Sequence, residues 1–287
     1  MTTAYMMFPG FRYKAVTLSY DDGMMFDPQL IERMDKYGLK GTFNLNSGQM
    51  AEKPYQEEYL HGRLTAEQCV ETYQNSGHEV AVHGYKHLSL PAYDTATKMN
   101  DVLFDRRTLE QMFGRVIKGM AYAYGTYDDD TLDVLKKCGI VYSRTINDTH
   151  NFELPKDWLK MHPTCHHNDE KLLELAQKFV DMEVDYECWW SWFNQSVKWF
   201  CLWGHSSEFF RDQNWDIIDK FGQIVGGRED IWHVTTGELY AYVQAFQSLE
   251  WSVEGKAVHN PSSIDVYVTY EGKKFVVPAG QTVQREL

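Results

Sequence analysis

Short runs of β-branched and aromatic residues alternate with amphipathic stretches over most of this chain. We predict seven strands from these runs, at 16–20, 42–46, 79–82, 116–122, 140–144, 197–203 and 231–235. Apolar residues at helical spacing predict helices at 27–38, 65–77, 94–113, 128–137, 170–181 and 237–247. Strands that alternate with helices form parallel β-α-β units, so the pattern predicts an α/β fold, either a barrel or an open doubly wound sheet.

Local signals mark the ends of two of these helices. Asp27 is a good N-cap with Pro28 at the first helical position, and Gly38 closes the helix that follows. Thr65 and Gln68 have the spacing of a capping box.

The pattern changes in the tail, where alternating strands at 264–270 and 274–277 are broken by glycine and proline. We therefore predict a main domain over residues 1–252 and a small β extension over 253–287. The extension covers an edge of the main domain within one chain or contributes to a homo-oligomer interface, and the sequence leaves both open.

Composition narrows the classes of function. The formal net charge is −13, which disfavours binding to nucleic acid or anionic membranes because both attract basic surfaces. The five cysteines have irregular spacing and form no C-x-x-C motif, so they predict neither a disulfide framework nor a structural zinc site. With no visible secretory signal or long apolar run, we expect a cytoplasmic protein.

Polar side chains follow five of the predicted strands. The carboxyl ends of parallel strands meet at one rim, where such folds bind their ligands. The residues at these positions are Asp21 and Asp22, then His83 with His87 four residues later, then Tyr124 and Gly125, then Arg144, and finally His205.

A metal site explains part of this set. Each motif alone is weak, because Asp21-Asp22 suits an ordinary turn and two histidines at i, i+4 merely share a face if they are helical. Two imidazoles and one carboxylate together make a three-ligand site that leaves coordination positions for water, as catalytic zinc requires. A second carboxylate, Asp21, then suits a general base.

The motifs resemble those of the NodB-type polysaccharide deacetylases, carbohydrate esterase family four. T-L-S-Y-D-D-G resembles the T-F-D-D-G motif, and H-G-Y-K-H resembles H-[ST]-x-x-H. A-Y-A-Y-G-T-Y-D resembles R-x-P-Y-G, and L-W-G-H resembles L-x-H. The motifs come in the family's order and cover roughly residues 14–248. The resemblance implies a distorted (β/α) barrel of seven strands.

The resemblance also implies roles for individual residues. Asp22, His83 and His87 would bind a divalent metal, with zinc expected first and cobalt, nickel or iron as alternatives. Asp21 would be the catalytic base and His205 the general acid, and the backbone N–H of Tyr124 would stabilise an oxyanion. The implied activity is removal of acetyl groups from N-acetylated or O-acetylated sugars.

Two positions depart from the family pattern. The third motif normally begins with an arginine that pairs with the base, and here that position is Ala121; Arg144 is a candidate replacement from the next strand. The acid that normally orients the final histidine has no clear counterpart, and Glu208 is one candidate. Trp203 shares strand parity with His205, so we predict that it lines the substrate site.

The segment M-H-P-T-C-H-H gathers His162, His166 and His167, to which the resemblance assigns no ligand role. We interpret these histidines as site-lining or structural in preference to a second metal site.

Three other functions compete with the deacetylase reading. The same fold could act as a metal-dependent amidohydrolase on a small cyclic amide or ureide. The missing arginine at Ala121 would suit a non-catalytic carbohydrate-binding relative. A non-haem iron oxygenase also uses two histidines and a carboxylate, but usually in an antiparallel β fold.

Overall fold

The computed structural model describes residues 4–183 and 196–284. Its main sheet is parallel and curls into a half-barrel, with the strand order β6-β5-β4-β3-β2-β8-β7, while β9 also pairs with β2. The predicted distorted (β/α) barrel is thus confirmed, with seven strands in the curled path and β9 as an eighth strand beside β2. The strands are β2 (Lys14–Asp21), β3 (Gly41–Leu45), β4 (Glu79–Val82), β5 (Gly119–Ala121), β6 (Tyr142–Arg144), β7 (Cys165–His166), β8 (Lys198–Gly204) and β9 (Ile231–His233).

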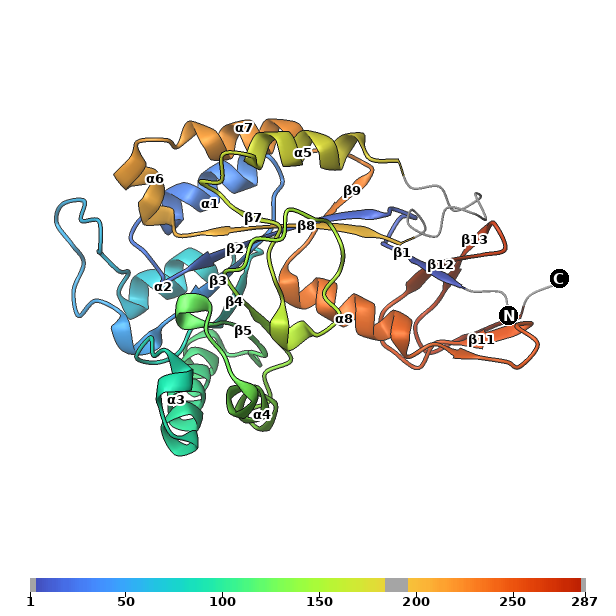
Figure 1. Cartoon of the computed structure of the whole chain (residues 1–287), viewed down its shortest axis with the longest axis horizontal. Coiled ribbons are helices and arrows are strands. Elements are labelled where there is room, and N and C mark those ends of the chain that lie inside the picture. Colours follow the sequence, from blue (N-terminus) through green and yellow to red (C-terminus); the bar gives the residue numbers. More distant parts are fainter. Residues whose placement is uncertain (1–3, 184–195, 285–287) are drawn as a thin grey trace.

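Helices cover both sides of the sheet. Figure 1 shows α5 and α7 side by side along one side, with α3 and α4 on the other. The helices are α1 (Asp27–Lys36), α2 (Ala66–Tyr73), α3 (Thr95–Phe113), α4 (Asp129–Lys137), α5 (Leu172–Asp181), α6 (Ser206–Asp212), α7 (Asp216–Val225) and α8 (Thr236–Gln247). Four 3-10 turns are η1 (Ser47–Gln49), η2 (Leu90–Ala92), η3 (Ala123–Gly125) and η4 (Trp158–Lys160).

The central strand β2 is buried along its whole length, as expected for a parallel strand covered on both faces. The capping box of Thr65 and Gln68 is present at the start of α2. Asp27 is not the N-cap that we predicted, because the cap position is Phe26. Its carboxylate is fully buried instead and accepts hydrogen bonds from Tyr73 and Ser206, both at 2.5 Å.

Strand β7 and helices α6 and α7 were not among the predicted elements. Strand β7 is only two residues long and lies in the histidine-rich segment, where no alternation is visible. Helix α6 has only seven residues, too few for a clear period. Helix α7 has ten residues, and its buried Ile218, Phe221 and Val225 are at helical spacing, so the sequence pattern could have found it.

The C-terminal tail takes part in two small antiparallel sheets, whose C-terminal strands are drawn in orange-red to red in Figure 1, next to the blue N-terminal strand β1. One sheet has the order β1-β12-β13, from β1 (Tyr5–Met7), β12 (Val266–Tyr270) and β13 (Lys273–Val277). The other has the order β10-β11-β14, from β10 (Glu250–Trp251), β11 (Ala257–His259) and β14 (Thr282–Gln284). Strand β1 pairs with β12 and β10 pairs with β11, so both sheets include a strand from outside residues 253–287. The expected domain boundary at residue 252 stays a prediction.

No helix among residues 4–183 and 196–284 is long and apolar enough to cross a membrane.

Candidate functional site

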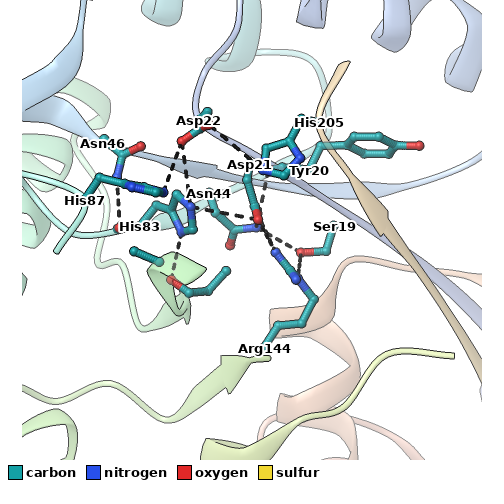
Figure 2. Close-up of polar contacts among 12 residues, drawn as sticks. Ser19, Tyr20, Asp21, Asp22, Asn44, Asn46, His83, His87, Arg144 and His205 are labelled. Atoms are coloured by element: carbon teal, nitrogen blue, oxygen red, sulfur yellow. Dashed lines mark hydrogen bonds and ion pairs between the residues drawn. The ribbon is translucent and has the colours of Figure 1, made fainter. Parts of the chain in front are cut away.

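The carboxyl ends of the parallel strands bring the predicted polar residues to one place. Asp21 ends β2, His83 follows β4, Arg144 ends β6 and His205 follows β8. Figure 2 shows these side chains converging around Asp21 and Asp22. The structure therefore unites residues that lie more than 180 positions apart in the sequence.

Asp22, His83 and His87 form a group of three side chains that could hold a metal ion. Asp22 Oδ1 lies 3.8 Å from His83 Nε2 and 3.7 Å from His87 Nε2. Ligands bonded to zinc at about 2.0–2.2 Å are separated by about 3.3–3.8 Å, depending on the angle between them. The donor types and their separations therefore fit a divalent cation such as zinc.

A hydrogen bond fixes the ring of His83. Its Nδ1 lies 2.8 Å from the carbonyl oxygen of Ala121, so Nδ1 carries the proton and Nε2 is left with a lone pair for a metal. Asn46 donates to the carbonyl oxygens of His83 and Gly84 at 2.8 and 2.7 Å, which holds the turn that follows β4.

The two histidines are not on a helix, contrary to what their spacing allowed. They lie on a turn in which Gly84 has φ +86° and His87 has φ +55°. A side chain at position 84 would place its Cβ 2.6 Å from Asp101 Oδ2, so this turn requires glycine. The turn, rather than a helix face, directs both imidazoles toward Asp22.

Asp22 is held in a conformation that non-glycine residues seldom adopt, with φ +85°. Arg63 donates to its backbone oxygen at 2.5 Å and to Oδ1 at 3.0 Å, and also to Asn46 Oδ1 at 2.8 Å. Burial would raise the pKa of the Asp22 carboxyl, but the charges of His83 and Arg63 outweigh it and lower that pKa.

Asp21 is buried beside the guanidinium of Arg144. Arg144 Nη2 donates to both carboxylate oxygens of Asp21, at 2.6 Å to Oδ1, and its Nε donates to Ser19 at 2.9 Å. Asn44 adds a donor to Asp21 Oδ1 at 2.8 Å. Burial alone would raise the pKa of Asp21, but the charge of Arg144 overcomes it and brings the pKa to about 2.

The strand register explains why Arg144 can stand in for the missing family arginine. Residue 121 of β5 pairs directly with Arg144 of β6, so the guanidinium reaches Asp21 from the neighbouring strand. Ala121 meanwhile supplies the carbonyl that orients His83. The geometry therefore supports the replacement that we hypothesised.

His205 lies beside the two aspartates (Figure 2), with Nε2 4.0 Å from Asp22 Oδ2. Its Nδ1 lies 3.3 Å from Glu208 Oε2, so Glu208, one candidate in the sequence analysis, occupies the orienting position. Burial alone would lower the pKa of His205, but the hydrogen bond with Glu208 and the charges of the two aspartates raise it to about 9.

Tyr124 and Trp203, the two predicted substrate-binding residues, differ in their exposure to solvent. Tyr124 is 59% exposed, has φ +58°, and its ring packs edge-on against His87 with the centroids 4.6 Å apart. Trp203 is 9% exposed, and its ring packs against the guanidinium of Arg144 at 4.7 Å. Tyr124 is thus accessible to solvent beside the metal-ligating His87. Trp203 packs mainly against Arg144 and has little exposed surface for the substrate contact that we predicted for it.

Sequence reasoning missed Arg63, Asn44 and Asn46. Arg63 lies in a polar loop without a motif, so no pattern pointed to it. The two asparagines lie at the end of the second predicted strand, and the same strand-end rule that found Asp21 could have found them.

Among the described residues, a second group of metal-ligating types is formed by His166, His205 and Glu208. His162 lies apart from it, with Nδ1 2.6 Å from Thr145 Oγ1.

Comparisons with known proteins agree with the motifs. Residues 10–143 match the model of the polysaccharide deacetylase family. The predicted family resemblance is confirmed. Over residues 10–143, the chain is therefore similar to hydrolases of the polysaccharide deacetylase type. No curated protein sequence gives a significant match.

Two solved structures share the fold at low sequence identity, and a third matches only part of the chain. A candidate polysaccharide deacetylase from Mycobacterium smegmatis is 18% identical with a TM-score of 0.59, over 86% of this chain and 96% of that chain. The Xyl-CE4 domain of a multidomain xylanase from the hindgut metagenome of Trinervitermes trinervoides is 12% identical with a TM-score of 0.51, over 81% and 92%. A Streptococcus pyogenes deacetylase in complex with acetate is 22% identical with a TM-score of 0.41, and the match spans 45% of this chain and 55% of that one.

Proposed function

We propose that this protein is a metal-dependent hydrolase that removes acetyl groups from N-acetylated or O-acetylated sugars. The observation that carries the proposal is that Asp21 and His205 both lie beside the three-ligand group of Asp22, His83 and His87. A buried carboxylate paired with Arg144 lies next to Asp22, and a histidine oriented by Glu208 lies 4.0 Å from the same aspartate. The match of residues 10–143 to the polysaccharide deacetylase family supports the same class of reaction.

Asp22, His83 and His87 would hold the cation, which supplies Lewis acidity that polarises the acetyl carbonyl and makes a water acidic enough for a weak base. Asp21 has a low pKa and stays ionised at neutral pH, so it takes the proton from that water as the oxygen attacks the carbonyl carbon. Arg144 keeps this carboxylate in place throughout the step.

His205 supplies the second proton. Its raised pKa keeps the imidazole protonated at neutral pH, and its Nε2 faces the site. We assign it the protonation of the leaving nitrogen or oxygen as the bond to the acetyl carbon breaks and acetate forms. The backbone N–H of Tyr124 is the proposed donor to the oxyanion of the tetrahedral intermediate.

Acetate release from a panel of N-acetylated and O-acetylated mono- and oligosaccharides tests the proposal. The protein would be stripped of metal and reloaded with zinc, cobalt or nickel, and Asp21→Asn and His205→Ala would be assayed alongside. Acetate release that returns with metal and is lost in both variants supports the proposal. Turnover of ureides or cyclic imides without acetate would instead identify an amidohydrolase, and sugar binding without turnover a non-catalytic relative.

A further inference from the structure

The histidine-rich segment on β7 contacts the proposed acid through Glu208. His166 Nε2 lies 2.9 Å from Glu208 Oε2, which is the same oxygen that lies 3.3 Å from His205 Nδ1. Two imidazoles therefore share one carboxylate oxygen, although one histidine is on β7 and the other follows β8.

The proton positions on His166 follow from its other contact. The backbone N–H of Asn168 donates to His166 Nδ1 at 3.1 Å, so Nδ1 accepts and Nε2 carries the proton. His166 Nε2 therefore donates to Glu208. A metal ligand at Nε2 would need the opposite tautomer and would lose the bond from Asn168, so the arrangement favours a hydrogen-bonded chain over a second metal site.

The ring of His166 is held firmly enough to act as a fixed donor. Its backbone N–H donates to Asp148 Oδ2 at 3.0 Å, and the other oxygen of Asp148 accepts from Trp203 Nε1 at 2.7 Å. His166 pairs with Trp203 in the strand register, and their rings pack edge-on with centroids 4.5 Å apart.

We propose that His166 is a positioning residue for the reaction, which fixes Glu208 so that the carboxylate holds His205 with Nε2 directed into the site. The inference rests on the proposed function of His205 as the acid. Without the donor from His166, Glu208 Oε2 keeps the backbone N–H of His205 at 3.1 Å, the imidazole that it must orient and the buried His167 at 3.4 Å. The half-exposed Arg211, on the same helix as Glu208, lies 3.7 Å from the other oxygen, Oε1.

The size of the effect follows from the bond that is lost. A hydrogen bond to a charged group contributes enough that its full loss in the transition state lowers a rate about 10- to 100-fold. We expect His166→Phe, which keeps a flat ring but removes the donor, to lower kcat by this factor with KM unchanged. His166→Gln, which restores an N–H donor, should recover most of the loss.

A matched control lies in the loop before the histidine-rich segment. His150 Nε2 contacts Asp169 Oδ2 at 2.6 Å, another histidine–carboxylate pair that does not contact Glu208. Because His150 has φ +52°, asparagine is the suitable replacement. His150→Asn should leave kcat and KM at their wild-type values.

Spectroscopy of ¹⁵N-labelled histidine separates this inference from the proposed function, since it needs no substrate. In His166→Phe the ring nitrogen signals of His205 should move toward those of Glu208→Gln, and in His166→Gln and His150→Asn they should stay. The assay and the spectra would be run on folded protein with zinc bound, with the number of zinc ions per chain measured for each variant.

Three results would overturn the inference: unchanged His205 signals in His166→Phe, a raised KM at constant kcat, or the loss of a second zinc ion in that variant. The KM result would assign His166 to substrate binding. If the wild type releases no acetate, the proposed function fails, and the spectra still decide whether His166 positions His205 through Glu208.

Discussion

Removing Arg144 should destabilise the fold because Asp21 would remain buried without a charged partner. Arg144 is 1% exposed, donates to both oxygens of Asp21, and also bonds to Ser19 Oγ and the carbonyl oxygen of Thr145. Breaking a buried ion pair by removing one partner costs about 3–5 kcal/mol. For a domain of this size that corresponds to a melting temperature lower by about 6–15 °C.

A double-mutant cycle with Arg144→Met and Asp21→Asn measures the interaction itself. Each single variant leaves one uncompensated group, whereas the double variant leaves none, so we expect the double variant to lose about 2–4 kcal/mol less than the sum of the singles. The measurement is urea unfolding of metal-free protein, which removes any contribution from metal binding.

Lys137→Met is the matched control, because Lys137 pairs with Asp133 at 2.5 Å on the surface with both side chains more than half exposed. Its unfolding midpoint should equal that of the wild type. Additive losses in the cycle, or single variants as stable as this control, would refute the reasoning that Arg144 compensates a buried Asp21.

Three further predictions follow from the pKa values and packing around the site. Burial raises the pKa of Asp27 to about 7, and the hydrogen bonds that its side chain accepts do not offset this. Protonated Asp27 therefore contributes stability that is full below about pH 4 and is lost as the pH rises toward 7. Asp27→Asn should remove a slope of about 1.4 kcal/mol per pH unit in the free energy of urea unfolding over that range, and an unchanged slope would contradict this. Glu208→Gln should shift the alkaline fall of kcat to lower pH, because the hydrogen bond that Glu208 accepts from His205 helps to raise the pKa of His205; a profile that does not move would count against it. Gly204→Ala should destabilise the protein by about 1–3 kcal/mol, since the new Cβ would lie 2.1 Å from His167 Nδ1, and equal unfolding midpoints would show that the ring can shift freely.

The main strands were predictable because a strand that is buried on both faces has a continuous run of mostly apolar residues in the sequence, as in β2 and β8. Strand β4 was predicted at its observed bounds. Strand β7 was not predictable, since two residues cannot show alternation and its pairing with β8 depends on the tertiary structure.

The candidate site likewise contains residues that could be predicted from the sequence and residues that could not. Asp21, Asp22, His83 and His205 follow predicted strands, so a rule about strand ends was enough to bring them together. Arg63 reaches the site from a loop, and the link between His166 and Glu208 joins strand β7 to helix α6. Both contacts depend on tertiary packing, and no local pattern carries that information. The turn at His83–His87 was missed for a related reason, since histidine spacing is the same in a helix and in a glycine turn.

The direct test of the central claim is a titration of metal-free protein with zinc, with acetate release from an acetylated oligosaccharide measured at each addition. Our account predicts that acetate release is absent without metal, rises in proportion to added zinc and levels off at one ion per chain, and that Asp22→Asn stays inactive throughout. Acetate release from the metal-free protein, or full activity of Asp22→Asn with zinc, would contradict the assignment of Asp22, His83 and His87 as the metal site.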